Sequence, residues 1–267
     1  MDREPRDRGG GGGGQVLLLI LPTGHPVRHF DRIDSTNLEA RRLAQDGERG
    51  PLWLLADEQT LGRGRLGRSW VSELGNLYAT FLFSIAEAAH LAAQVSFVAA
   101  LAVHDMVMTL RPHLGPRIKW PNDVLIGGAK FCGVLPEVVG DSPTRIAIGC
   151  GVNIAHAPEG TPYPVTALGK DLAVPAVLAE LDASLTRRLA QWDEGRGFGT
   201  IRDDWAARAL GMGGSVTATS GARRITGTFK GLAADGALLL EEADTTLTPI
   251  HSGEVSFAEL ERQRRNT

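Results

Sequence analysis

Several residue types are scarce in this sequence, and each scarcity narrows the possible functions. Only two cysteines, Cys132 and Cys150, occur in 267 residues. They form neither a disulfide framework nor a zinc-binding spacing, so we expect reduced thiols in a core. Neither sign of charge dominates, since 28 Lys+Arg face 31 Asp+Glu. The net charge of −3 excludes a surface uniformly basic enough to coat nucleic acid or an anionic membrane.

Long hydrophobic runs are also missing from the sequence. No run of apolar residues approaches the roughly 18 that are needed to span a bilayer. The apolar stretch nearest the N-terminus covers only residues 16–21, and acidic residues before it do not suit a signal peptide. We therefore expect a cytoplasmic protein with neither DNA nor a membrane as a partner.

Lysine is rare as well. Of the 28 basic residues, 24 are arginine and four are lysine, at positions Lys119, Lys130, Lys170 and Lys230. A compact ammonium performs chemistry that a guanidinium does not, so each lysine is a candidate for a specific role. Two of the four, Lys119 and Lys130, lie eleven residues apart around one predicted hairpin.

The hydrophobic pattern predicts an α+β main domain at residues 15–211 and a small all-β domain at residues 212–267. A charged leader at residues 1–14 ends in six glycines; it has nothing to bury, so we expect it to be disordered and to hold no DNA-binding helix-turn-helix. The periodicity predicts helices over residues 36–45, 91–110, 174–192 and 199–210, and strands over residues 16–21, 52–56, 76–85, 118–120, 131–139, 145–154, 225–229 and 236–240. For the first helix, Thr36 and Glu39 are expected to form a capping box and Gly47 to end the helix.

A glycine- and arginine-rich segment, Gly62-Arg-Gly-Arg-Leu-Gly67-Arg68-Ser69, fits the dinucleotide-binding pattern and nearly fits the P-loop pattern. Both patterns require a helix directly after the glycines, whereas a strand is predicted here, so we reject both. Three arginines (Arg63, Arg65, Arg68) within six residues suit a carboxylate or a phosphate, because guanidinium groups bind these anions with paired hydrogen bonds. A solvated surface loop is the alternative, and Trp70 beyond it suits either a stacked base or a core position.

A second group of residues surrounds the predicted hairpin, in Lys119-Trp-Pro-Asn-Asp123 and Lys130-Phe-Cys-Gly133. The hairpin brings its ends together, so Lys119 or Lys130 is expected to share a pocket with Asp123. A lysine there steadies negative charge developing at phosphorus or at a carbonyl, and an aspartate holds Mg²⁺ or orients an amine. The alternative is a Pro-Asn turn in which Asp123 binds its own backbone.

Two further motifs each have a structural and a functional interpretation. Gly149-Cys-Gly-Val-Asn153 ends a strand, and Asn153 either makes a turn or pairs with an adenine edge. Asp34-Ser-Thr-Asn37 begins a helix, where its side chains either cap the helix or line a polar ligand group. No H-E-x-x-H zinc motif and no G-x-S-x-G nucleophile motif occurs.

Taken together, these motifs resemble the biotin–protein ligase family. The order and spacing of the Asp34-Ser-Thr-Asn37, Gln59-to-Trp70, Lys119-to-Asp123, Lys130-x-x-Gly133 and Gly149-x-Gly-x-Asn153 segments carry the resemblance, which extends over about residues 28–260. It implies a catalytic domain of the class II synthetase-like biotin–lipoate ligase fold, with a mixed sheet and flanking helices, followed by a small SH3-like β-barrel. The arginine that often follows the last strand of that barrel is replaced here by Phe257.

The resemblance also implies an activity. Such enzymes use MgATP to convert biotin to biotinyl-5′-AMP, and then transfer biotin to a lysine of a biotin carboxyl carrier domain in a carboxylase. By motif, the implied catalytic residues are Lys130, Arg63, Arg65 and Asp123, with Asp123 also the expected Mg²⁺ ligand. The implied biotin-binding residues are Ser35, Thr36, Asn37, Gln59, Arg63, Gly64, Arg65, Lys130 and Gly133. The implied nucleotide-binding residues are Arg65, Trp70, Lys119, Asn122 and Asn153.

Two other functions compete with this hypothesis. A lipoate–protein ligase shares the catalytic fold, but the R-R-x-x-G-G-G-x-V segment of that family is not found in the sequence. Some biotin ligases also repress transcription through an N-terminal DNA-binding domain, which a 14-residue leader and a net charge of −3 do not favour. The sequence therefore predicts a ligase that acts only as an enzyme.

Overall fold

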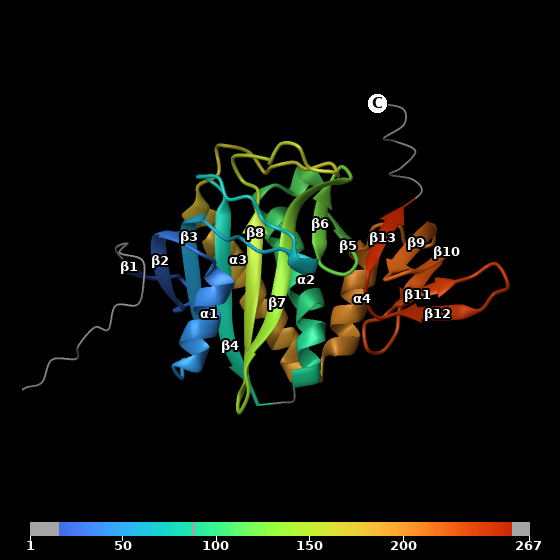
Figure 1. Cartoon of the computed structure of the whole chain (residues 1–267), viewed down its shortest axis with the longest axis horizontal. Helices are drawn as coiled ribbons and strands as arrows, with labels where there is room; N and C mark the ends of the chain where they lie inside the picture. Colours follow the sequence, from blue (N-terminus) through green and yellow to red (C-terminus); the bar gives the residue numbers. More distant parts are fainter. Residues whose placement is uncertain (1–15, 87–88, 258–267) are drawn as a thin grey trace, which may run out of the picture.

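The computed structural model describes residues 16–86 and 89–257, so the predicted leader lies outside the described residues. An eight-stranded sheet forms the centre of the main domain (Figure 1). Its strands, in spatial order, are β1 (Val16–Ile20), β2 (Pro26–Ile33), β3 (Leu52–Gln59), β4 (Leu77–Ile85), β8 (Thr144–Val152), β7 (Ala129–Gly140), β6 (Asp123–Ile126) and β5 (Arg117–Lys119). The β2–β3 pair is parallel and the other neighbours are antiparallel, which confirms the predicted mixed sheet.

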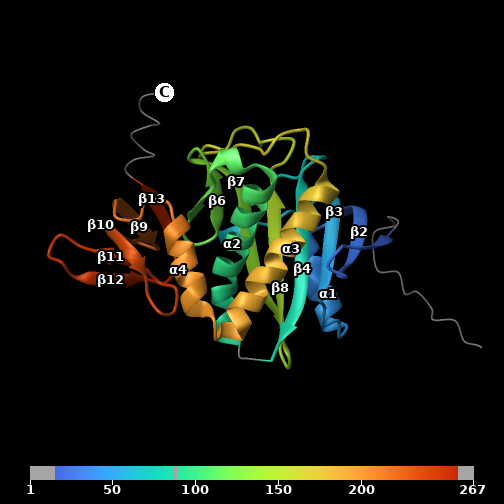
Figure 2. The ribbon, with the colours of Figure 1, turned by 180° about the vertical axis from the view of Figure 1, so that it is seen from behind.

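Helices cover both faces of this sheet. Helix α1 (Thr36–Gln45) lies on one face, and α2 (Ala92–Leu110) and α3 (Val174–Trp192) lie on the other, as Figures 1 and 2 show. Helix α4 (Phe198–Arg208) packs against α2 and α3. Short 3₁₀ turns are η1 (Arg65–Gly67), η2 (Ala89–Leu91), η3 (Pro112–Leu114) and η4 (Asp193–Gly195). The α3 periodicity predicted its bounds correctly, because one face of that helix is strongly apolar.

The beginning of α1 differs from the predicted capping box. Ser35 is the N-cap residue, without a side-chain cap, and Thr36 is the first helical residue. The Thr36 hydroxyl group instead lies 3.2 Å from Oε1 of Gln59. The predicted end is confirmed, since Gly47 has a φ of +96° and its N–H donates to the carbonyl of Ala44.

Helix α2 is the most deeply buried helix in this layer. By length and composition alone it is long and apolar enough to cross a membrane, contrary to the expectation from the sequence that no segment would be. Most of its apolar side chains, such as Val98, Leu101 and Met106, are however fully buried between the sheet and the neighbouring helices. Packing within the core therefore accounts for the apolar composition of this helix.

Helix α1 is much shorter than the strands on which it lies. Its ten residues extend about 15 Å, whereas the nine residues of β4 or β8 extend about 30 Å. Ala40 and Ala44 pack on one half of this face together with Leu54, Leu82 and Ala147. Among the described residues, no α-helix covers the other half, beyond the N-terminus of α1.

The C-terminal residues form a separate antiparallel sheet beside β5 and α4 (Figures 1 and 2). Its strands, in spatial order, are β12 (Leu247–Ile250), β11 (Leu238–Glu241), β10 (Arg223–Leu232), β9 (Ser215–Ser220) and β13 (Glu254–Phe257). The sequence pattern missed β9, β12 and β13, as it missed β2, because these strands are short or rich in polar residues. The α+β class with a small all-β C-terminal unit is confirmed.

One buried carboxylate connects three parts of the main domain. Asp182 on α3 is fully buried, and its Oδ1 accepts a hydrogen bond from Nε1 of Trp53 on β3 at 2.8 Å. The same oxygen lies 2.7 Å from Nδ1 of His25, in the turn between β1 and β2, and Oδ2 accepts from Thr23. The β1–β2 turn and β3 are thus held to the helical layer by polar contacts with one buried carboxylate.

We predict that Asp182→Ala lowers the free energy of unfolding by about 3 kcal/mol, because it leaves the buried indole N–H of Trp53 without an acceptor. Urea denaturation measures the change. Asp203→Ala is the matched control, since the side chain of Asp203 is 77% exposed, and we expect it to stay within about 0.5 kcal/mol of the unaltered protein. Equal stability of the two variants would contradict the role of Asp182.

Candidate active site

The uncovered half of the sheet contains a cavity of about 310 Å³. Its walls come from the start of α1, the end of β3, the Gly/Arg segment, the β5–β6–β7 hairpins, residues 163–164 and β13. Of the fourteen residues to which the resemblance assigned a role, thirteen line it: Ser35, Thr36, Asn37, Gln59, Arg63, Gly64, Arg65, Trp70, Lys119, Asn122, Asp123, Lys130 and Gly133. The structure therefore brings together motifs that are up to 98 positions apart in the sequence.

Glycines form the floor of the cavity. Across the sheet, Asp123 pairs with Gly133, Gly133 with Gly151, and Gly151 with Tyr78. The indole ring of Trp70 lies on the two glycines, so closely that a Cβ atom at Gly151 would lie 2.6 Å from Cε2 of that ring. Glycine is needed at these positions because the ring occupies the space that a side chain would fill.

A β-bulge determines the face on which Lys130 lies. Leu125 pairs with Lys130 whereas Val124 pairs with Cys132, so Phe131 is an extra residue in β7. A bulge shifts the alternation of side chains by one position and re-aims them. Lys130 is therefore on the same face as Gly133, and a Cβ at Gly133 would lie 3.3 Å from its Nζ atom.

The ammonium of Lys130 has three close neighbours. Its Nζ lies 2.7 Å from Oδ1 of Asp123, and both side chains are largely buried. It also lies 5.4 Å from the ring centre of Trp70 and 5.6 Å from that of Tyr163. The cation is thus held in the cavity by one carboxylate and two aromatic faces.

A buried polar cluster stands where α1 meets the sheet. Oε1 of Gln59 accepts a hydrogen bond from the backbone N–H of Thr36 at 2.9 Å. The Thr80 hydroxyl donates to Oδ1 of Asn37 at 2.6 Å and lies 2.8 Å from the Thr36 hydroxyl. A Cβ at Gly149 would lie 2.3 Å from the same Asn37 oxygen, so only glycine leaves room for this amide. The cluster offers fixed donors and acceptors to a polar ligand group.

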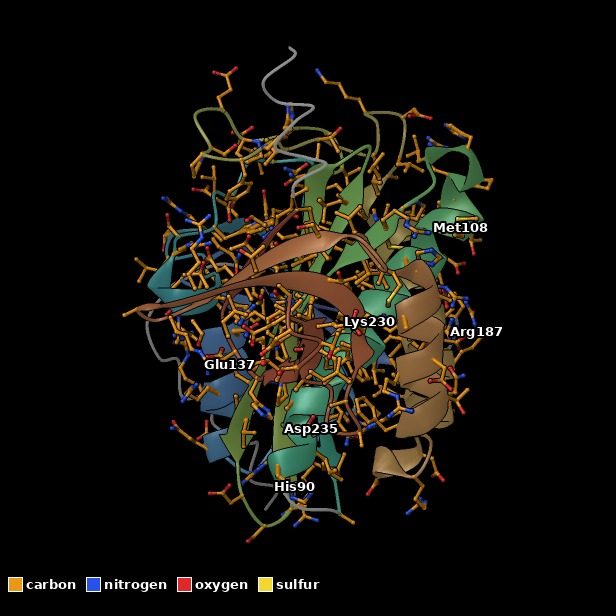
Figure 3. The ribbon with its side chains drawn as sticks, turned by 90° about the vertical axis from the view of Figure 1, so that its right-hand side faces the viewer. His90, Met108, Glu137, Arg187, Lys230 and Asp235 are labelled. Carbon is orange, nitrogen blue, oxygen red and sulfur yellow. The ribbon has the colours of Figure 1, made fainter. Side chains whose placement is uncertain are left out.

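The three arginines of the Gly/Arg segment each have a partner within the protein. Arg65 donates to Oδ1 of Asn122 at 3.0 Å, and Arg68 pairs with Glu254 of β13. Arg63 lies 3.7 Å from Glu137, which Figure 3 shows beside α1. The pKa of Arg65 lies below its ordinary value because burial lowers it, and the nearby carboxylate of Asp123 offsets this effect only in part. A guanidinium nevertheless stays charged at neutral pH, because its ordinary pKa is so high.

Two comparisons with known proteins bear on this arrangement. A model of the Biotin/lipoate A/B protein ligase family matches residues 29–153, and one of the Biotin protein ligase C terminal domain matches residues 212–258. The biotin--[acetyl-CoA-carboxylase] ligase of Paracoccus denitrificans is 42% identical over 221 residues, which cover 78% of this chain and 91% of that protein. The chain belongs to the biotin protein ligase family. The family predicted from the motif order is confirmed.

Other proteins that are similar to this chain support its assignment to the biotin protein ligase family. The bifunctional ligase/repressor BirA of Bacillus subtilis is 30% identical over 249 residues, which cover 88% of this chain and 74% of that protein. A solved biotin protein ligase from Aquifex aeolicus, in complex with biotin and ATP, superposes with a TM-score of 0.74 at 30% identity. That match covers 86% of this chain and 97% of the other.

Asn153 is the one predicted site residue that does not line the cavity. Its side chain is buried and donates to the carbonyl of Thr166 at 3.1 Å. Its backbone N–H donates to Phe131 and its carbonyl accepts from Leu168. The observed contacts of Asn153 thus hold a loop beside β7, and its predicted place on the nucleotide side stays a prediction.

Several lining residues were not predicted from the sequence. Tyr78, Tyr163 and the β13 segment around Glu254 all border the cavity. No local pattern distinguishes Tyr163 or Glu254, because each reaches the site through tertiary packing alone. Gly149 and Gly151 belong to a motif that the sequence did indicate, although it did not reveal that they form the floor.

The two thiols beside the cavity are poor nucleophiles. Burial raises the pKa of Cys132 well above its ordinary value and that of Cys150 to about 12. Both cysteines are buried and free, as expected from the sequence. Since the thiolate is the reactive species, neither cysteine is suited to covalent catalysis at neutral pH.

We predict that Gly151→Ala displaces the Trp70 ring, since the added methyl group would lie 2.6 Å from it. The overlap should lower the free energy of unfolding by about 1–3 kcal/mol. It should also change the near-ultraviolet circular dichroism spectrum, which reports tryptophan environments.

Gly199→Ala is the control, because no heavy atom lies within 4 Å of the new Cβ on α4. This substitution should be neutral or stabilise the helix by up to about 1 kcal/mol. An unchanged near-ultraviolet spectrum for Gly151→Ala would refute the close packing of Trp70.

Proposed function

We propose that this protein activates biotin with ATP to biotinyl-5′-AMP and transfers the biotinyl group to a lysine of a biotin carboxyl carrier domain. The observation that carries the proposal is one cavity in which Lys130, Arg63 and Arg65 meet the buried polar cluster around Thr36. The named activities of the relatives and the biotin and ATP in the Aquifex complex support the same reaction.

Activation requires two anions to meet. An oxygen of the biotin carboxylate attacks the α-phosphorus of ATP, a new O–P bond forms, and pyrophosphate leaves. Repulsion between carboxylate and triphosphate opposes this step, so the enzyme must neutralise charge and fix the geometry. In our proposal the Lys130 ammonium and the Arg63 and Arg65 guanidiniums perform this task.

The polar end of the cavity suits the ureido ring of biotin. A ureido group offers two N–H donors and one carbonyl acceptor, and Ser35, Thr36, Asn37 and Gln59 supply hydroxyl and amide groups there. These side chains are almost wholly buried except for Gln59. A ligand without the donors and acceptors of a ureido ring would therefore leave polar groups of the cavity without hydrogen-bond partners. Gly64 and Gly133 are proposed to let the backbone and Lys130 approach the bound biotin.

The nucleotide is proposed to occupy the opposite end, toward the β5–β6 hairpin and β13. Lys119, Asn122 and Trp70 border that end, with Arg65 between the two halves through its bond to Asn122. Asn153 contributes by holding the adjoining loop in place. The same region is open to β13, so the C-terminal sheet helps to enclose the intermediate.

Mg²⁺ is proposed to enter with ATP. The described residues contain no group of three or more His, Cys, Asp or Glu side chains that could hold a metal. This suits Mg²⁺ bound mainly by phosphates and water with one protein carboxylate. Asp123 is the candidate for that carboxylate, and the bound ion would neutralise phosphate charge.

In the second reaction, the carrier lysine attacks the carbonyl carbon of the mixed anhydride, an amide bond forms and AMP leaves. Asp123 borders the cavity and would orient the incoming amine. Exclusion of water matters, because water would otherwise hydrolyse the anhydride. We place the reaction in the cytoplasm, with ATP, biotin and the carrier domain of a biotin-dependent carboxylase as partners, and without DNA or a membrane.

A lipoate–protein ligase is the competing function. The family model that matches residues 29–153 includes both ligase types, so that match alone does not separate them. The relative at 42% identity is a biotin ligase, and the C-terminal match is to a biotin ligase domain. These two findings favour biotin.

We predict that the purified protein releases pyrophosphate from ATP when biotin is added and forms an acid-labile adenylate. Addition of a biotin carboxyl carrier domain should then give a product heavier by one biotinyl group in mass spectrometry. Lipoate in place of biotin is the control. If a product formed with lipoate but not with biotin, the assignment would be overturned.

We predict that Lys130→Ala lowers the rate of adenylate formation by about 10²–10³-fold, because a cation that balances transition-state charge is removed. Circular dichroism checks that the variant is folded. Lys230→Ala is the matched control, since Lys230 is half exposed, pairs with Glu241 and lies on the C-terminal sheet (Figure 3). It should keep full activity, and full activity in Lys130→Ala would exclude the proposed role.

A further inference from the structure

Tyr163 faces the proposed catalytic cation although no motif includes it. Its ring centre lies 5.6 Å from Nζ of Lys130, and that of Trp70 lies 5.4 Å away from the same atom. Tyr163 is partly buried and lines the cavity. The two rings therefore flank an ammonium whose charge is also balanced by Asp123 at 2.7 Å.

The segment that carries Tyr163 is fixed to the backbone of Lys130. The N–H of Lys130 donates to the carbonyl of Pro164 at 2.9 Å, and the N–H of Thr166 donates to the carbonyl of Lys130 at 3.0 Å. These bonds form a parallel bridge between Lys130 and Val165. The buried amide of Asn153 holds the same segment through the carbonyl of Thr166. Tyr163 is consequently positioned relative to Lys130 by backbone hydrogen bonds.

A lysine side chain has four methylene groups and many rotamers, so its ammonium needs constraint before it can act at one point. Asp123 alone would draw the ammonium toward the β6 strand. An aromatic ring face attracts the ammonium electrostatically but does not accept a conventional hydrogen bond from it. The rings therefore confine the ammonium and leave its N–H groups free to donate to a bound anion. Loss of one face would let the ammonium occupy several positions.

We propose that Tyr163 is a positioning residue, whose ring face holds the Lys130 ammonium toward the centre of the cavity. The inference rests on the proposed role of Lys130 in adenylate formation. Tyr163 acts in the free enzyme, before ligands arrive. The ring rather than the hydroxyl group performs this function.

The first test compares Tyr163→Leu, which removes the ring, with Tyr163→Phe, which keeps it. Steady-state adenylate formation should show a kcat lower by about 5- to 30-fold for the leucine variant. Its KM values for biotin and ATP should stay within about twofold of those of the unaltered enzyme, since the ring is not proposed to contact either substrate in the ground state. The phenylalanine variant should keep nearly full activity; an equal loss in both variants would overturn the inference.

The second test asks whether Tyr163 acts through Lys130. In the Lys130→Ala background, Tyr163→Leu should cause no further loss in single-turnover adenylate formation, because residues that act as a unit are not additive. A full additional loss, or a raised KM for ATP with unchanged kcat, would indicate direct contact with the nucleotide. Either result would overturn the inference.

A third measurement does not depend on catalysis. Ring currents from Trp70 and Tyr163 should shift the Lys130 ε-methylene protons upfield in the NMR spectrum, and the chain has only three other lysines. Tyr163→Leu should move this resonance downfield, whereas Tyr163→Phe should not. An unmoved resonance refutes the contact even in an active enzyme. Conversely, the expected shift in a protein that makes no biotinyl adenylate would refute the proposed function and not the contact.

Discussion

The site depends on a difference in length between helix α1 and the strands beneath it. Ten helical residues cover about half of a nine-residue strand, because a helix rises about 1.5 Å per residue and a strand about 3.3 Å. The uncovered half is bounded by the first residues of the helix, so Thr36 and Asn37 begin α1 and also face the cavity. Glycines on β7 and β8 then provide a floor on which Trp70 can lie. Each later feature of the site occupies space that the short helix leaves open.

Three of the five cations that line the cavity lie near a carboxylate of the protein before any ligand binds. Lys130 pairs with Asp123, Arg63 lies near Glu137 and Arg68 pairs with Glu254. Carboxylates of the protein therefore offset part of the repulsion between Arg63 and Arg68 in the Gly/Arg segment. An arriving carboxylate or phosphate thus meets cations that are oriented in advance, and little reorganisation is required for catalysis.

The sequence predicted those parts of the structure that local patterns determine. The strong apolar period of α3 predicted its bounds, and motif spacing predicted which loops meet in the cavity. Polar or short strands such as β2 and β13 were missed, since their pairing depends on neighbours far away in the sequence. The prediction of a capping box at the start of α1 was wrong, because the Thr36 hydroxyl has a tertiary partner in Gln59. The face of Lys130 depends on a bulge, which simple alternation does not reveal.

The pentapeptide from Lys119 to Asp123 explains why the two sheets form one working unit. Asn122 and Asp123 contact Arg65 and Lys130 in the cavity. Trp120, between them and Lys119, is buried, and its Nε1 donates to the carbonyl of Gly236 at 3.3 Å, in the turn between β10 and β11 of the C-terminal sheet. Buried apolar residues of both sheets also belong to one continuous core. A shift of the C-terminal sheet would therefore move Trp120 and the adjacent site residues with it, so the site geometry depends on residues well outside the catalytic motifs.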